Sequence, residues 1–177
     1  MAETIKDLLE ISLQDTYSAE NQILAALPEL EDVVSSPKLK QAFREHIEQT
    51  ERQVERLEEV CEMLGIEPDG ESCAAMEGLV EEADDLMEEL EEGPVLDAAL
   101  IGAAQKIEHY EMAAYGTLCS LLKSMGQTKA VDLLAQTLKE EKDTDELLTR
   151  IAEQEVNPAA MQTLPADAPV GGSRDAT

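Results

Sequence analysis

The chain has few large aromatic residues: it contains no tryptophan, one phenylalanine and three tyrosines among 177 residues. Because hydrophobic residues still make up 43% of the sequence, its core must be aliphatic, and its length is that of one domain with a core of its own. Glycine and proline are also few, and few segments alternate with the period of two that strands require. This composition predicts an all-α protein.

Positive charge is scarce as well. Thirteen lysine and arginine residues stand against 40 acidic residues, which gives a formal net charge of −27. Such a charge argues strongly against nucleic acid or an anionic membrane surface as a partner. Most of the acidic runs are typical of solvated helix faces. The excess also suggests the hypothesis that the protein is halophilic, adapted to a salt-rich cytoplasm in which ions screen the self-repulsion.

This halophilic hypothesis predicts that the melting temperature rises steeply between millimolar and molar KCl. The Debye length shrinks from ~30 Å at 0.01 M to ~3 Å at 1 M salt, so the repulsion between surface carboxylates fades over this range. Thermal melts at increasing KCl concentration measure the effect. A flat curve would mean that the acidic surface has another cause, such as solubility.

Long apolar runs and paired cysteines are missing too. No segment approaches the ~18 consecutive apolar residues that suggest a membrane span, and the first ten residues, MAETIKDLLE, contain no basic or apolar signal segment. The cysteines Cys61, Cys73 and Cys119 match no CxxC motif and are interpreted as reduced thiols. We therefore expect a cytoplasmic protein with no membrane association.

Four long amphipathic segments carry apolar residues three and four positions apart, which is the spacing of a buried helix face. A shorter acidic helix is predicted at residues 72–91, inside the long connection 65–94. Two helical hairpins joined by one such crossover have the topology of a ferritin-like four-helix bundle. The long helices are predicted at residues 4–34, 36–64, 94–125 and 128–155.

Two further expectations concern the crossover and the C-terminal end. The crossover helix has an apolar face, formed by Leu79, Leu86 and Leu90, which must pack on the bundle or on a second subunit. We expect a homodimer rather than a large ferritin-like shell. Residues 1–156 are predicted to form the bundle domain. The Pro-rich, aperiodic residues 157–177 are predicted to be a disordered tail.

Acidic residues interrupt the apolar face near the middle of each long helix. The acidic residues on the two helices of each hairpin are about equally far in sequence from the turn that joins them. At ~1.5 Å rise per residue, they should therefore lie at about the same height in the bundle. A carboxylate cluster in an apolar core repels itself and carries a large desolvation cost, which a pair of metal ions would offset. The alternative is that each of these acidic residues is a core group with hydrogen-bond partners or lies on a frayed helix face. The candidates on or beside these faces are Glu20, Glu48, Glu51, Glu108, Glu111, Glu141 and Asp145.

Four segments closely resemble the YciF-like bacterial stress-response family of the ferritin-like superfamily. They cover the chain up to about residue 155 and read DTYSAENQIL, HIEQTERQVERLE, DAALIGAAQKIEHYEMAAYGTL and TLKEEKDTDELLT. The resemblance implies a four-helix bundle that holds a di-iron or di-manganese centre. In the superfamily pattern, two helices each provide a Glu, and the other two each provide a Glu-x-x-His pair.

The resemblance also implies roles for particular residues of the first two long helices. Glu20 matches the glutamate of the first helix. Glu48 and Glu51 occupy the Glu-x-x-His positions of the second helix, with Glu51 where the superfamily has histidine. The neighbouring His46 is interpreted as a flanking residue that supports the site without binding metal.

For the last two long helices, the resemblance implies that Glu108 and Glu111 match the Glu-x-x-Glu of some rubrerythrin-like members. Glu141 and Thr144 occupy the fourth-helix pair, again without histidine, and Asp145 is the substitute ligand considered. Ligands that are mostly oxygen favour hard ions such as manganese or ferric iron. The implied function is a dinuclear iron or manganese centre that reacts with O2 or peroxide under stress. The alternative is a metal-free bundle with a structural or stress-interaction role, which the missing histidines favour.

Overall fold

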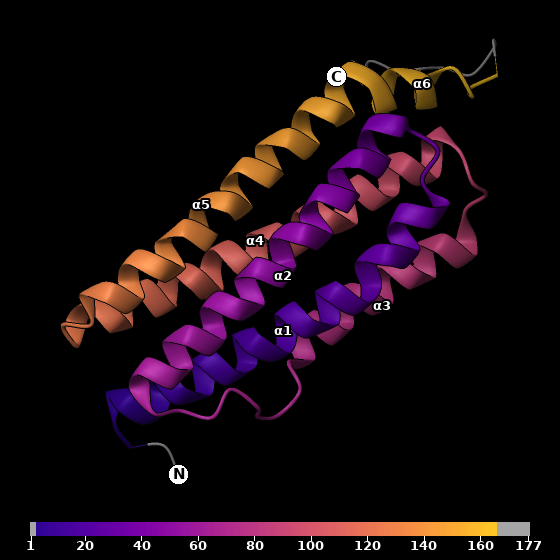
Figure 1. Ribbon diagram of the computed structural model, residues 1–177. Helices are drawn as coiled ribbons and strands as arrows, with labels where there is room; N and C mark the ends of the chain where they lie inside the picture. Colours follow the sequence, from indigo (N-terminus) through magenta and orange to yellow (C-terminus); the bar gives the residue numbers. More distant parts are fainter. Residues whose placement is uncertain (1–2, 166–177) are drawn as a thin grey trace, which may run out of the picture.

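The computed structural model describes residues 3–165, which form helices and no strand. The four long helices lie side by side as a bundle (Figure 1), which confirms the predicted all-α architecture. None of the helices in this described part combines the length and apolarity needed to cross a membrane. The bundle helices are α1 (Ile5–Val33), α2 (Pro37–Leu64), α4 (Pro94–Ser124) and α5 (Thr128–Ile151).

The two hairpins, α1 with α2 and α4 with α5, contact each other through the pairs α1–α4 and α2–α5. The connection between the hairpins runs along the bundle, so α2 and α4 point in the same direction (Figure 1). This connection contains α3 (Ala74–Glu89), which packs on α1 and α4. Leu79, Leu86 and Leu90 are partly buried against the core, so the apolar face of the crossover is covered by its own bundle. The homodimer stays a prediction.

Local sequence explains where the helices begin and end. Thr4 and Asp7 form a reciprocal capping box at the start of α1, which satisfies backbone N–H groups that have no partner within the helix. At the start of α2, the side chain of Ser36 accepts a hydrogen bond from a backbone N–H of the first turn. Gly65 ends α2 with a φ of 67°, a left-handed conformation that glycine adopts without strain.

A buried carboxylate from α4 holds the turn between α1 and α2. Asp97 is 2% exposed. Its Oδ1 accepts a hydrogen bond from the Ser35 backbone N–H at 2.8 Å, and its Oδ2 accepts from the Ser36 N–H at 2.9 Å and the Ser35 hydroxyl at 2.7 Å. One side chain thereby fastens the turn of the first hairpin to the first turn of the second.

After α5, the structure differs from the predicted tail. A π-helical turn (Ala152–Val156) leads into a short helix, α6 (Asn157–Met161), so the prediction of disorder from residue 157 is wrong for these residues. Pro158 lies in the first turn of α6, where its missing N–H removes no helical hydrogen bond. The last part of the predicted tail, residues 166–177, lies outside the described residues.

Contacts back to α2 explain why the chain stays helical here. Val156 is 1% exposed. Glu155 accepts a hydrogen bond from the Ser36 hydroxyl at 2.7 Å and forms an ion pair with Lys38, also at 2.7 Å. The π-helical turn is therefore anchored to the start of α2 by the charged Glu155, and its Val156 is buried in the apolar cluster.

The core of the bundle consists of two apolar clusters with a polar layer between them. One cluster includes Leu27 and Phe43, near the α1–α2 turn, and the other includes Leu13 and Leu57, towards the opposite end. Apart from Asp97 in the first turn of α4, the buried polar residues of the bundle helices lie near the middle of each helix, where one cluster gives way to the other. The predicted pattern of helices that are apolar at their ends and acidic at their middle holds for α1, α4 and α5, whereas the buried middle of α2 contains His46, Thr50 and Gln53.

Candidate metal centre

A group of buried side chains of the types that bind metals lies in the polar layer. His46 of α2, Glu108 and Glu111 of α4, and Glu141 of α5 each offer one ligand atom, and these atoms all lie within 4.8 Å of one another. None of the four residues is more than 5% exposed. Glu20 of α1 is fully buried and faces Glu111. All four helices of the bundle therefore contribute to one site.

Many polar atoms of this group have no hydrogen-bond partner. Both carboxylate oxygens of Glu111 lack one, as does one oxygen each of Glu20, Glu108 and Glu141, and so does His46 Nδ1. Unpaired carboxylates are almost never fully buried, because desolvation without a partner is costly. A cation would supply the missing partners, and carboxylate oxygen with imidazole nitrogen suits iron and manganese. The residues thus fit a metal centre.

The pKa values of the buried carboxyl groups also show that their burial is not compensated by partners. Burial raises the pKa of Glu20 to about 7 and that of Glu108 to about 8. The pKa values of Glu111 and Glu141 also lie well above the ordinary value, first through burial and then through repulsion by neighbouring carboxylates. Without metal, a proton on Glu111 allows it to donate to Glu20, and a proton on Glu141 allows it to donate to Glu108. Without a metal, the layer therefore retains protons that a cation would displace.

The histidine of the group is uncharged at neutral pH. Burial lowers the pKa of His46 to about 4, so its imidazole keeps a lone pair available for a metal. His46 Nε2 lies 3.3 Å from Glu108 Oε1. Because the imidazole is neutral, this contact joins two polar groups and is not an ion pair.

We expect the metal-free protein to lose stability as the pH rises from about 5 to about 8. A carboxyl group with a higher pKa in the folded state takes up a proton on folding, so it stabilises the fold fully below its unfolded pKa. That stabilisation is lost as the pH rises through the folded pKa. The loss therefore extends from the ordinary pKa of 4.5 to the raised pKa, which is about 7 for Glu20 and about 8 for Glu108. His46 has the opposite effect, because its contribution to stability is lost as the pH falls below its unfolded pKa of 6.5. It is one group against several carboxyl groups.

Thermal melts of chelator-treated protein in molar KCl, which screens the surface charge, measure this pH dependence. The metal-loaded protein is the control, because ligand deprotonation makes metal affinity increase with pH. A melting temperature of the metal-free protein that increases between pH 5 and 8 would contradict the prediction.

Polar neighbours orient the α5 side of the group. Gln53 of α2 donates a hydrogen bond to Glu141 Oε1 and a second, at 3.2 Å, to Glu140 Oε2. Arg56 binds Glu140 with two hydrogen bonds, at 2.6 and 2.8 Å. Glu140 is thus a satisfied carboxylate directly beside the unsatisfied Glu141.

Two tyrosines of α4 lie near the group. Tyr115 is buried, and its hydroxyl donates to Glu20 Oε1. The hydroxyl of Tyr110 donates to Asp15 at 2.7 Å and lies 3.0 Å from Cys73 Sγ. The first fixes a carboxylate of the site, and the second joins α4 to α1 and to the start of α3.

Of the predicted site residues, Glu20, Glu108, Glu111 and Glu141 are buried and brought together. The two candidates from α2 are not: Glu48 and Glu51 are exposed, so the predicted place of Glu51 on the buried face is wrong, and Glu48, predicted at the flank of that face, also points away from the group. The residues that α2 turns inward are His46, Thr50 and Gln53. Their spacing of four and then three positions was the sequence signal for this face.

Asp145 lies at the outer edge of the α4–α5 pair and is not a member of the group within 4.8 Å. It is partly exposed. Its Oδ1 accepts a hydrogen bond from Gln105 Nε2 at 2.9 Å and lies 3.5 Å from His109 Nε2. Its carboxylate therefore already has partners on the helix surface.

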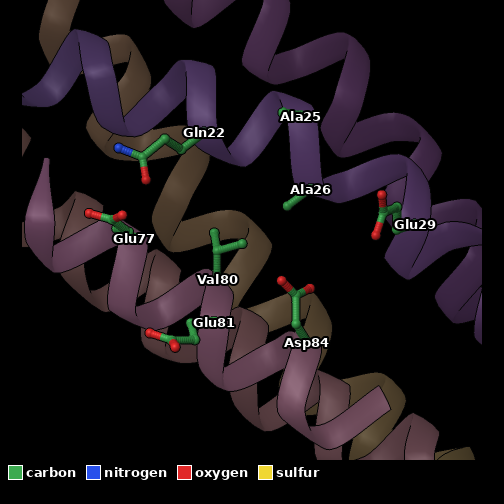
Figure 2. Close-up of a pocket in the computed structure, with 8 residues that line it drawn as sticks. All are labelled: Gln22, Ala25, Ala26, Glu29, Glu77, Val80, Glu81 and Asp84. Atoms are coloured by element: carbon green, nitrogen blue, oxygen red, sulfur yellow. The ribbon is translucent and has the colours of Figure 1, made fainter. Parts of the chain in front are cut away.

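A groove of about 490 Å³ lies on the outside of the bundle between α1 and α3 (Figure 2). It contains none of the buried group, and its carboxylates are exposed to solvent, where they need no counter-ion. The groove therefore provides no buried candidate metal site. The groove is lined by Gln22, Ala25, Ala26, Glu29, Glu77, Val80, Glu81 and Asp84.

Comparison with known proteins agrees with this architecture. Residues 4–161 match the family described as Domain of unknown function (DUF892). The chain belongs to the DUF892 family. This DUF892 protein is 49% identical over 158 residues to protein YciF of Escherichia coli strain K12, which covers 89% of the chain and 95% of YciF. It superposes on the crystal structure of the E. coli stress protein YciF with a TM-score of 0.85 and 48% identity, over 88% of this chain and 99% of that one.

Two other solved structures are similar. YcfI of Rhodopseudomonas palustris, named as a candidate structural protein, matches with a TM-score of 0.81 and 41% identity, over 83% of this chain and 94% of that one. A two-domain protein of Anabaena variabilis with DJ-1/ThiJ/PfpI-like and ferritin-like domains matches with a TM-score of 0.58 and 18% identity, over 97% of this chain and 42% of that one. The second likeness concerns the fold alone.

Proposed function

We propose that this protein binds a dinuclear iron or manganese centre in its polar layer and reacts there with O2 or peroxide, as a cytoplasmic stress protein. The observation that supports this most directly is the set of buried carboxylate oxygens without a partner, above all both oxygens of Glu111. Among the described residues, only one group of this kind could hold a metal ion. The proposed ligands are Glu20, His46, Glu108, Glu111 and Glu141.

The proposed ligands suit a hard cation. Four carboxylates and one imidazole favour manganese or ferric iron over softer metals. When bound, such a metal pair would supply the redox chemistry for the reaction with O2 or peroxide. Glu111 would be able to offer both of its oxygens to the metal, because neither has a hydrogen-bond partner.

Residues around the ligands position them and limit the access of water. Gln53 fixes the orientation of Glu141, and Tyr115 fixes that of Glu20; such outer hydrogen bonds hold ligands in place and tune a metal site. The apolar clusters on both sides of the layer, which include Leu27 and Leu57, keep bulk solvent out.

Metal analysis of variants tests the proposal. We expect protein purified without chelators to contain about two metal ions per chain, as di-metal bundles of this type do. His46→Gln should weaken iron or manganese binding tenfold or more. Glu51→Gln, at a solvent-exposed position of the same helix, should leave it unchanged. The proposal fails if wild-type protein cannot be loaded, or if Glu51→Gln weakens binding and His46→Gln does not.

A second candidate function is that of a metal-free structural or stress-interaction bundle. It is favoured by the inward residues Thr50 and Gln53 of α2, which offer neither a carboxylate nor an imidazole, whereas the superfamily pattern has a Glu-x-x-His pair on two of its helices. The relative named as a candidate structural protein supports it too. Protein that stays metal-free and resists loading with iron or manganese would decide in its favour. We expect a homodimer under either function.

A further inference from the structure

A small apolar cavity adjoins the buried group. It has a volume of about 10 Å³, the room that one water-sized molecule needs. Six of its eight lining residues are aliphatic, among them Ala26 and Leu27 of α1 and Ala104 of α4. The other two are His46 and Glu108. A molecule in this cavity would therefore touch two of the proposed ligands.

The size and surface of the cavity select its occupant. A volume of about 10 Å³ leaves room for one molecule of about the size of water and excludes an organic substrate. Nearly all of the surface that faces the cavity is apolar. Water and hydrogen peroxide need several hydrogen-bond partners when buried, whereas cavities lined by aliphatic groups stay dry and take up apolar molecules. We infer that this cavity binds O2, and that O2 rather than peroxide is the oxidant brought to the site.

The position of Ala26 provides a route from solvent. Its side chain lines the cavity and also the groove between α1 and α3, into which it points in Figure 2. The neighbouring Ala25 lines the groove but not the cavity, and it is exposed. One alanine side chain thus forms part of the wall between the two spaces. Because an alanine leaves little bulk in that wall, we expect O2 to enter the cavity at this point.

The O2-binding part of the inference is tested on metal-free protein. Dissolved O2 is paramagnetic and speeds the NMR relaxation of methyl groups that it touches. Under O2 pressure, with N2 pressure as the reference, the methyl groups of Leu27 and Ile107 at the cavity should relax several-fold faster than those of Leu118 and Leu134. The second pair is fully buried in the other apolar cluster. Equal enhancement in both clusters would overturn the inference.

Matched variants show whether the cavity is responsible. Ala26→Leu should remove the excess relaxation, whereas Ala25→Leu, the same change at the exposed neighbouring position, should leave it intact. Ala104→Val fills the cavity from α4, in case the larger side chain at position 26 turns to solvent. An excess that survives both Ala26→Leu and Ala104→Val would overturn the assignment.

The preference for O2 over peroxide rests on the proposed function and is tested on metal-loaded protein. Relative to Ala25→Leu, Ala26→Leu should slow the oxidation of the bound metal by O2 several-fold. It should slow the oxidation of the metal by hydrogen peroxide much less. Equal slowing by both oxidants would overturn the preference. If the chain cannot be loaded, the proposed function fails, while the relaxation measurement still decides whether the cavity binds O2.

Discussion

Replacing Glu111 by leucine should raise the melting temperature of the metal-free protein and remove most of the stabilisation that iron or manganese provides. Glu111 is 1% exposed, and neither of its carboxylate oxygens has a partner. A packed hydrophobe in place of a buried polar or charged group without compensation is often stabilising by ~1–4 kcal/mol. For a protein of this size, that corresponds to roughly 2–15 °C in melting temperature.

The matched control for this change is Glu140→Leu, the same substitution on α5. Glu140 accepts two hydrogen bonds from Arg56, so its removal leaves a partly buried cation unpaired and should lower the melting temperature. Melts of both variants and wild type, with and without manganese or iron, measure the effects. A metal-free Glu111→Leu protein that melts well below metal-free wild type would count against the di-metal site, since it would mean that Glu111 stabilises the fold without a metal.

Asp97→Ala should be among the most destabilising single substitutions in the molecule. The carboxylate is buried and accepts hydrogen bonds from two backbone N–H groups and one hydroxyl of the α1–α2 turn. A buried donor left without a partner costs ~1–3 kcal/mol. With one such donor at the buried Ser36 and a second, partly buried, at the exposed Ser35, we expect a loss of about 2–3 kcal/mol in the free energy of unfolding. In a chain with a net charge of −27, removing an acidic residue would otherwise be favourable.

Urea unfolding of Asp97→Ala, Asp97→Asn and Asp85→Ala separates these contributions. Asp85 is exposed on α3, so Asp85→Ala controls for the change in charge and should be neutral or slightly stabilising. Asp97→Asn keeps one acceptor oxygen and should lie between Asp97→Ala and wild type. A free energy of unfolding for Asp97→Ala within about 0.5 kcal/mol of wild type, the usual scatter of surface substitutions, would show that the turn is held by other means.

The sequence predicts α4 and its part of the site well. Glu108 and Glu111 interrupt a dense run of apolar residues, so the buried face of this helix can be located on both sides of them. The same holds for Glu20 on α1 and Glu141 on α5. At these positions the neighbours determine the face, and each carboxylate is then recognised as an interior residue.

The sequence predicts α2 less well, because its buried face is polar over several turns. The inward residues His46, Thr50 and Gln53 have the hydropathy of a surface, whereas the half-buried Ile47 and Val54 suggest a core face one residue away. One residue corresponds to about 100° of rotation in an α-helix, enough to bring Glu51 to the predicted interior. Only the packing of α2 against α5, through Gln53 and Glu141, determines which face points inward.

The C-terminal helix illustrates a second limit. Local composition around Pro158 is typical of a disordered tail. What keeps the segment before it ordered is a contact with a distant part of the chain, since Glu155 binds Ser36 and Lys38 of the α1–α2 turn. A pattern read along the sequence contains no information on such a partner. The same is true of Asp97, whose importance depends on the backbone of Ser35 and Ser36.

The polar layer has a consequence for how the helices are aligned along the bundle axis. A core of leucine, isoleucine, valine and alanine alone would tolerate a helix that slides by one turn, about 5.4 Å, because apolar side chains can exchange partners at small cost. In this bundle, such a slip would carry Glu20 or Glu141 out of the layer and into an apolar cluster, away from Tyr115 or Gln53. We therefore expect the layer to fix the register of the four helices, with or without a metal bound.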